Sequence, residues 1–103
     1  MKVLIDAMRD GVEDDLIRHG YEAYSTKKLC EEGEKLQSDY SIIRYSQKNN
    51  MVLVTEDIDN VEGCRENGID HIQFTQAQTL DYLLAELEKI KRKRRKTKLK
   101  DFS

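Results

Sequence analysis

Val52-Leu53-Val54-Thr55-Glu56-Asp57-Ile58-Asp59 is a β-branched apolar run that leads directly into three acids within four positions. Such a run predicts a buried strand whose carboxyl end carries charged side chains. A second run, Lys2-Val3-Leu4-Ile5-Asp6, has the same form and also ends in an acid. In open α/β sheets, ligands bind beyond the carboxyl ends of the strands. We therefore expect Asp6 and Asp57 to face each other across one pocket.

Two further β-like runs occupy residues 21–25 and 70–74, and helical patterns separate all four runs. Strands that alternate with helices favour parallel pairing through helical crossovers. The pattern therefore predicts an α/β fold with a short, mostly parallel sheet of four strands. Helices are expected at residues 11–19, from a Ser38 cap to Asn49-Asn50, at 61–67, and after a capping box at Thr75 and Gln78.

A long C-terminal helix is predicted by leucines and an isoleucine at three- and four-residue spacing, the pattern of a surface helix packed on a sheet. The stripe consists of Leu80, Leu83, Leu84, Leu87 and Ile90. Residues 26–37 contain few strong apolar side chains, and we expect a short helix and a loop there. At 103 residues the chain has the size of one domain. We place that domain at residues 1–90 and a basic tail at residues 91–103.

The net charge of −2 hides a strong division along the chain. Residues 1–88 contain 9 Lys or Arg against 19 Asp or Glu, whereas residues 89–103 contain 9 Lys or Arg against one Asp. An acidic body suits cation binding, and a dense basic segment attracts phosphates. Nucleic acid is therefore an expected partner. The residues expected to contact nucleic acid are Lys91, Arg92, Lys93, Arg94, Arg95, Lys96 and Lys98.

Cys30 and Cys64 are the only cysteines, and they do not form a paired metal-binding motif. They are interpreted as reduced thiols. The sequence contains no signal-like apolar amino terminus and no apolar run of about 20 residues that would span a bilayer. We expect a cytoplasmic protein without membrane contact.

A helix opened by Ser38-Asp39 and rich in isoleucine places another acid at an element boundary. Together with the strand that ends in Asp6 and the stretch from Val52 to Asp59, this pattern resembles the PIN-like nucleases. The resemblance covers roughly residues 1–74 and is closest to small, single-domain members related to toxins. It implies a three-layer α/β/α fold and metal-dependent hydrolysis of RNA.

The resemblance implies that the site consists of Asp6, Asp39, Asp57 and Asp59. Asp6 and Asp57 would be direct ligands of Mg²⁺ or Mn²⁺, because hard divalent cations bind carboxylate oxygens. Asp39 would be a ligand or would hold the attacking water, and Asp59 would serve a second metal or lie outside the first ligand sphere. Thr55 would orient a ligand through its hydroxyl. The resemblance also admits an inhibitory antitoxin partner and a homodimer.

Structural roles compete with these assignments. Asp59 and Glu62 have capping-box spacing, and Asp39 lies in a first helical turn, where the helix dipole favours any acid. Asn60 follows the last acid where the family commonly has an aromatic residue, and Ala7-Met8 also departs from its pattern. These departures favour an alternative function, a non-catalytic module on the same fold that binds nucleic acid or protein. A phosphoacceptor receiver domain is a third reading, ranked last because Asp6 has no acidic neighbour in sequence.

Overall fold

The computed structural model describes the backbone of residues 1–6 and 11–102 and the side chains of residues 1–6 and 11–96. Ala7, Met8 and the Lys98 side chain therefore lie outside the described residues. Within the described part, strands and helices alternate along the chain. The elements are β1 (Lys2–Asp6), α1 (Val12–Arg18), β2 (Glu22–Ser25), α2 (Thr26–Glu31), α3 (Asp39–Lys48), β3 (Val52–Thr55), α4 (Ile58–Glu66), β4 (His71–Gln73) and α5 (Leu80–Phe102).

The described strands form one four-stranded sheet in the order β2-β1-β3-β4, and each neighbouring pair is parallel. The prediction of a mostly parallel sheet is confirmed. The chain runs from β1 outward to β2 and then returns to β3 on the other side of β1. This reversal makes the boundary between β1 and β3 a topological switch point, where ligands of open α/β sheets bind. Asp6 of β1 lies opposite Thr55 of β3 at that boundary.

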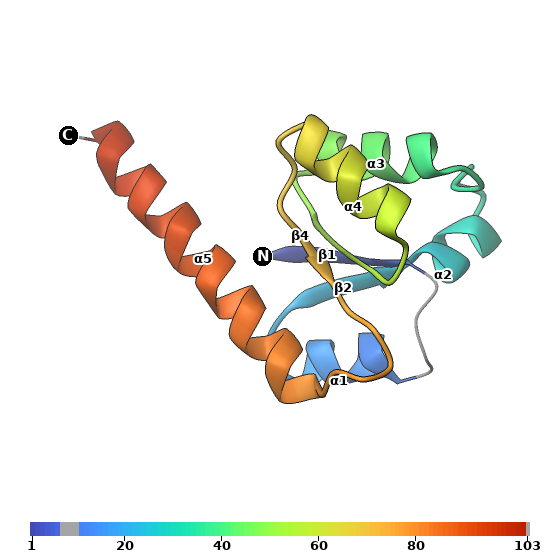
Figure 1. The fold of residues 1–103 in the computed structure, drawn as a ribbon, viewed down its shortest axis with the longest axis horizontal. Helices are drawn as coiled ribbons and strands as arrows, with labels where there is room; N and C mark the ends of the chain where they lie inside the picture. Colours follow the sequence, from blue (N-terminus) through green and yellow to red (C-terminus); the bar gives the residue numbers. More distant parts are fainter. Residues whose placement is uncertain (7–10, 103) are drawn as a thin grey trace.

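Successive strand residues point to opposite faces of the sheet, and each face is covered by helices (Figure 1). Val3 and Val54 belong to an apolar cluster with residues of α1 and α5. Leu4 and Leu53 belong to a second cluster with residues of α2, α3 and α4. The arrangement is compatible with a three-layer α/β/α fold. By the same alternation, Asp6 and Thr55 point toward the face that α2, α3 and α4 cover.

Local signals explain where the helices around this face begin. Ser38 and Ser41 form a capping box, in which each side chain accepts a hydrogen bond from the other residue's backbone N–H. Helix α3 therefore begins at Asp39, as predicted. Helix α4 begins at Ile58, three residues earlier than predicted, because Asp57 caps it and accepts a hydrogen bond from the Asp59 N–H.

Close packing of α3 against α4 holds the two helix starts near each other. Gly63 of α4 faces Ile43 of α3, and a Cβ atom on Gly63 would overlap the end of the Ile43 side chain. Ile43 lies four residues, about one helical turn, after Asp39, and Gly63 lies four residues after Asp59. The absence of a side chain at Gly63 thus contributes to the approach that brings these acids together.

Helix α5 starts later and extends further than the sequence indicated. The predicted contact between Thr75 and Gln78 exists, since the Thr75 N–H donates to Gln78 Oε1 at 2.8 Å, but it closes a turn before the helix. Thr79 Oγ1 accepts from the Tyr82 N–H and is positioned as the cap. The helix continues without interruption through the basic segment, and its carboxyl-terminal part extends away from the sheet (Figure 1).

Candidate metal centre

Asp6 lies at the end of β1, where three side chains donate hydrogen bonds to its carboxylate. Thr26 of α2 donates to Oδ1 at 3.4 Å, while Thr55 and Asn60 donate to Oδ2 at 3.2 and 2.8 Å. Hydrogen bonds to a carboxylate stabilise its charged form and fix its orientation. Asp6 is therefore held in one orientation at the switch point of the sheet.

Asn60, which the sequence marks only as a departure from the family pattern, lies at the site. Its side chain is 0% exposed, and its amide N–H groups reach Asp6 at 2.8 Å and Thr55 Oγ1 at 3.4 Å. Its Oδ1 atom has no hydrogen-bond partner among the described residues. The helical spacing of the sequence was the available signal. Asn60 lies on the same face of α4 as Val61 and Cys64, and this face is buried.

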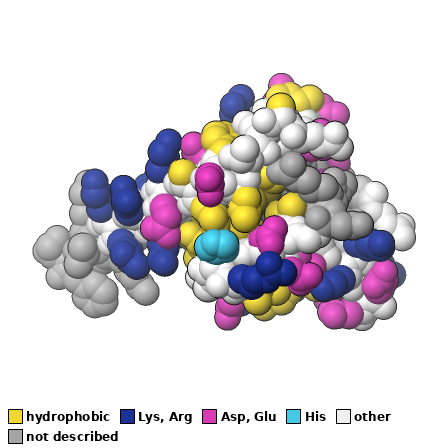
Figure 2. All heavy atoms as spheres, turned by 90° about the horizontal axis from the view of Figure 1, so that it is seen from below, with side chains coloured by type: hydrophobic (Ala, Val, Ile, Leu, Met, Phe, Trp, Pro, Cys, Tyr) yellow, Lys and Arg dark blue, Asp and Glu magenta, His cyan; other side chains and the backbone are white. Residues whose placement is uncertain are grey.

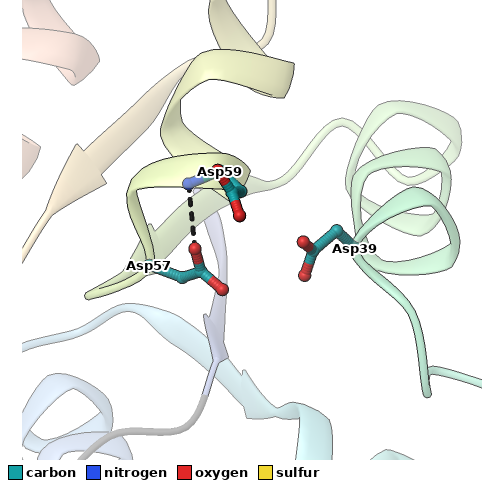
Figure 3. Close-up of side chains that lie close together, drawn as sticks. All are labelled: Asp39, Asp57 and Asp59. Carbon is teal, nitrogen blue, oxygen red and sulfur yellow. Dashed lines mark hydrogen bonds between the residues drawn. The ribbon is translucent and has the colours of Figure 1, made fainter.

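Thr55 connects Asp6 to the loop that carries Asp57. Its buried hydroxyl donates to Asp6 and accepts a hydrogen bond from the Asp57 N–H at 3.1 Å. The expectation that this hydroxyl orients an acid of the site agrees with its position. Asp57 in turn uses Oδ1 to accept from the Asp59 N–H at 2.8 Å, which directs its second oxygen away from α4 (Figure 3).

Asp39, Asp57 and Asp59 form an exposed acidic cluster, and each offers a carboxylate oxygen within 4.8 Å of the others. Asp39 projects from α3 toward the two acids at the start of α4 (Figure 3). Asp6 lies outside this triplet but is close enough to act on it electrostatically. Desolvation raises the pKa of Asp39, and the negative charges of Asp57, Asp59 and Asp6 raise it further.

A hollow of about 280 Å³ lies next to the cluster and is lined by Asp6, Thr55, Glu56 and Asp57. The hypothesis that Asp6 and Asp57 face one pocket thus agrees with the structure. Asp57 belongs both to this hollow and to the acidic cluster, so the two features adjoin. Glu56 also lines the hollow and is exposed.

These donors suit a hard divalent cation. All are carboxylate oxygens, the ligand type of Mg²⁺ and Mn²⁺. Ligands at about 2.1 Å from one ion are at most about 4.2 Å apart. The oxygens of the acidic cluster lie within 4.8 Å of one another, so small rotations of exposed side chains are sufficient. The three acids of the cluster therefore fit such an ion. Asp6, held by its three hydrogen bonds, lies close to them.

The basic segment lies at the other end of the sheet. Lys93 and Arg94 bind Asp70, the residue before β4, at 2.6 and 2.9 Å, and Arg94 also donates to the Asn50 carbonyl. Lys91 lies 5.8 Å from the centre of the Tyr21 ring. Three of the expected nucleic-acid contacts are thus engaged within the molecule. Arg92, Arg95 and Lys96 are exposed and form no ion pair with a described residue.

Positive side chains gather along α5 at the left of Figure 2, beyond the body of the molecule. The acidic cluster lies at the carboxyl ends of the strands, whereas this basic surface lies beyond their amino ends (Figure 1).

Within the described residues, no helix combines the length and the apolar character needed to cross a bilayer. Comparisons with models of protein families, with curated proteins and with solved structures give no match.

Proposed function

We propose that this protein is a PIN-like, Mg²⁺- or Mn²⁺-dependent ribonuclease that hydrolyses phosphodiester bonds in RNA. The observation that carries the proposal is the position of the acids. Asp39, Asp57 and Asp59 share one cluster, and Asp57 also shares a hollow with Asp6 at the switch point of the sheet. The PIN-like resemblance of the sequence selects nuclease chemistry from the reactions that such a cluster supports.

The residues have distinct roles in this proposal. Asp39, Asp57 and Asp59 bind the cation, and Asp6 completes the negative surface from the side of β1. Bound there, the cation supplies Lewis-acid charge for attack of water on a phosphodiester. Thr26, Thr55 and Asn60 hold Asp6 in one orientation. Glu56 is exposed and lines the same hollow as Asp6 and Asp57.

The exposed acids suit a polymeric substrate. Asp39, Asp57 and Asp59 are all exposed, so a phosphodiester within a chain reaches them without entering a closed cavity. RNA is the proposed substrate, the cytoplasm is the proposed location, and an inhibitory protein that covers the cluster is a proposed partner. A homodimer of this chain is the proposed assembly.

Cleavage of a labelled single-stranded RNA in Mn²⁺ tests the proposal. We expect Asp6→Asn, Asp39→Asn and Asp57→Asn to lose most of the cleavage. Asn is as good a helix cap as Asp, so Asp57→Asn keeps the start of α4 intact. Asp81→Asn is the matched control, because Asp81 is exposed in the first turn of α5. Unchanged cleavage in Asp6→Asn and Asp57→Asn would refute the assignment.

A non-catalytic binding module is the second candidate function. The observation in its favour is the position of Arg92, Arg95 and Lys96, which are exposed on α5 and lie far from the acids. Under this reading the chain binds RNA or protein through α5, and chelation of divalent cations leaves binding unchanged. RNA that is bound but not cut by the purified protein in Mn²⁺ would favour this candidate.

A further inference from the structure

A second and larger hollow lies along α3, next to the acids. Its volume is about 770 Å³, and it extends between α3 and the segment at residues 33–36 that precedes it. Its α3 side includes Tyr40, Ser41, Arg44 and Lys48. These residues recur at three- and four-residue spacing and therefore lie on one face of the helix. We refer to this hollow as the α3 groove.

The α3 groove is positively charged on a body that is otherwise acidic. Lys35, Arg44 and Lys48 are exposed and line it, with Glu34 as the one acid among the lining residues. Residues 1–88 contain 9 basic side chains against 19 acids. Three of those nine therefore gather in one groove. Such a groove attracts a polyanion where the rest of the body repels it.

An exposed aromatic ring accompanies this charge. Tyr40 is 70% exposed, more than any other large hydrophobic residue on the described surface. The Arg44 guanidinium lies 5.8 Å from the centre of the Tyr40 ring, which is within cation–π range. Arg44 thus supports one side of a ring that is otherwise open to solvent. Aromatic rings beside cations are the stacking platforms of proteins that bind single-stranded nucleic acids.

The α3 groove and the acidic cluster both reach the first turn of α3, but on different sides of the helix. Asp39 lies on the side of Ile43, which faces α4, whereas Tyr40, Ser41 and Arg44 line the groove. Asp39 is the first residue of α3, and Tyr40 and Ser41 lie in the same turn. Helix α3 contains ten residues, from Asp39 to Lys48, and is roughly 15 Å long. The basic part of α5, in contrast, lies at the other end of the sheet. Arg44 and Lys48 are the basic side chains that α3 contributes to the groove.

We infer that the α3 groove holds a segment of single-stranded RNA, whose backbone passes around the amino terminus of α3 to reach the acidic cluster. Tyr40 stacks on a base, while Lys35, Arg44 and Lys48 bind phosphates. These cations offset the repulsion between the acids and the RNA backbone. The inference rests on the proposed function, since it names the surface through which the same site recognises its substrate. Double-stranded RNA lacks the accessible base that Tyr40 requires.

Binding is measured with Asp57→Asn, which keeps RNA intact, by the fluorescence anisotropy of a labelled, unstructured RNA at several salt concentrations. We expect Tyr40→Ala in this background to weaken binding by at least about fivefold, the lower range of one base stack. We expect the double variant Arg44→Gln and Lys48→Gln to lower the salt slope by about 2. Tyr82→Ala and Arg65→Gln, which change exposed residues of α5 and α4, are the matched controls.

The outcomes separate this inference from the nuclease proposal. Loss of binding in the α3 variants but not in the controls supports the groove, even where the wild-type protein does not cut RNA. Cleavage and binding that survive the α3 variants overturn the groove and leave the nuclease proposal standing. Competition by polyglutamate, together with full binding in Tyr40→Ala, overturns it in favour of an acidic protein partner. Thermal unfolding verifies that each variant is folded.

Discussion

Asp6 and Thr55 lie opposite each other in the register of β1 and β3, and the Thr55 hydroxyl donates to Asp6 Oδ2 at 3.2 Å. The same hydroxyl accepts from the Asp57 N–H at 3.1 Å. One buried side chain therefore couples an acid at the end of β1 to the loop that follows β3. The relative position of the two strands, which the sheet fixes, determines the relative position of the two acids.

We predict that Thr55→Val destabilises the protein by about 1–3 kcal/mol, because a partly buried carboxylate and a backbone N–H both lose a partner while the side-chain shape is kept. Cleavage should fall as well, since Asp6 and Asp57 lose their common link. Chemical denaturation measures the first effect. Thr55→Ser keeps the hydroxyl and is the matched control. Equal stability of Thr55→Val and wild type would contradict the coupling.

Asn60→Asp should destabilise the protein in a pH-dependent manner. The substitution places a buried carboxyl group beside the carboxylate of Asp6. Because the two negative charges repel each other, the pair holds one proton more readily in the folded state than in the unfolded state. The raised pKa makes the folded state take up the proton. The loss of stability is thus greatest at neutral pH and shrinks as the pH falls toward about 4. Denaturation at pH 7.5 and 4.5 measures it, and a pH-independent loss would contradict the contact.

Asp39→Asn should raise the melting temperature in a chelating buffer. Desolvation and three neighbouring acids raise the pKa of Asp39. A carboxyl with a raised folded pKa lowers stability once the pH exceeds that pKa, and the substitution removes this penalty. Mg²⁺ or Mn²⁺ should stabilise the wild type more than Asp39→Asn. Differential scanning calorimetry measures both effects. An identical response of the two proteins to the cations would argue against Asp39 as a ligand.

Asp70→Asn should release the basic part of α5 and lower stability by about 1.5–3 kcal/mol. Desolvation acts to raise the pKa of Asp70, but hydrogen bonds and charges from Lys93 and Arg94 outweigh it, and the pKa is lowered. The stabilisation is present above the unfolded pKa of about 4 and is lost as the pH falls through the folded pKa. Denaturation at pH 7 and pH 3 should therefore show a smaller difference between variant and wild type at pH 3 than at pH 7.

Replacement of Arg92, Arg95 and Lys96 with Gln tests the basic segment separately from the acids. All three are exposed, so the free energy of unfolding should change by less than about 0.5 kcal/mol. RNA affinity at low salt should fall, with a salt slope lower by up to about 3. Cleavage at saturating RNA should be unchanged, because these residues lie at the other end of the sheet. A loss of cleavage at saturation would place them at the site instead.

The predictable features of this protein are those encoded by near neighbours in the sequence. Apolar alternation located the four strands to within about one residue, and Ser38 located the start of α3. The start of α4 was missed because two nearby acids have the spacing of a cap, and local sequence does not decide between Asp57 and Asp59. The contact of Asn60 with Asp6 was not predicted, because the two residues lie 54 positions apart in the sequence.

The sequence by itself determined which segments form strands and helices, and it placed acids at the ends of β1 and β3, because both properties follow from periodicity and capping over a few residues. Tertiary structure alone decided which acids meet. The crossover from β2 back to β3 and the packing of α3 on α4 place Asp39 beside Asp57 and Asp59, while Asp6 is held by Thr26, Thr55 and Asn60. Lys93 and Arg94 bind Asp70 for the same reason: such contacts depend on strand order and register, which no local pattern encodes.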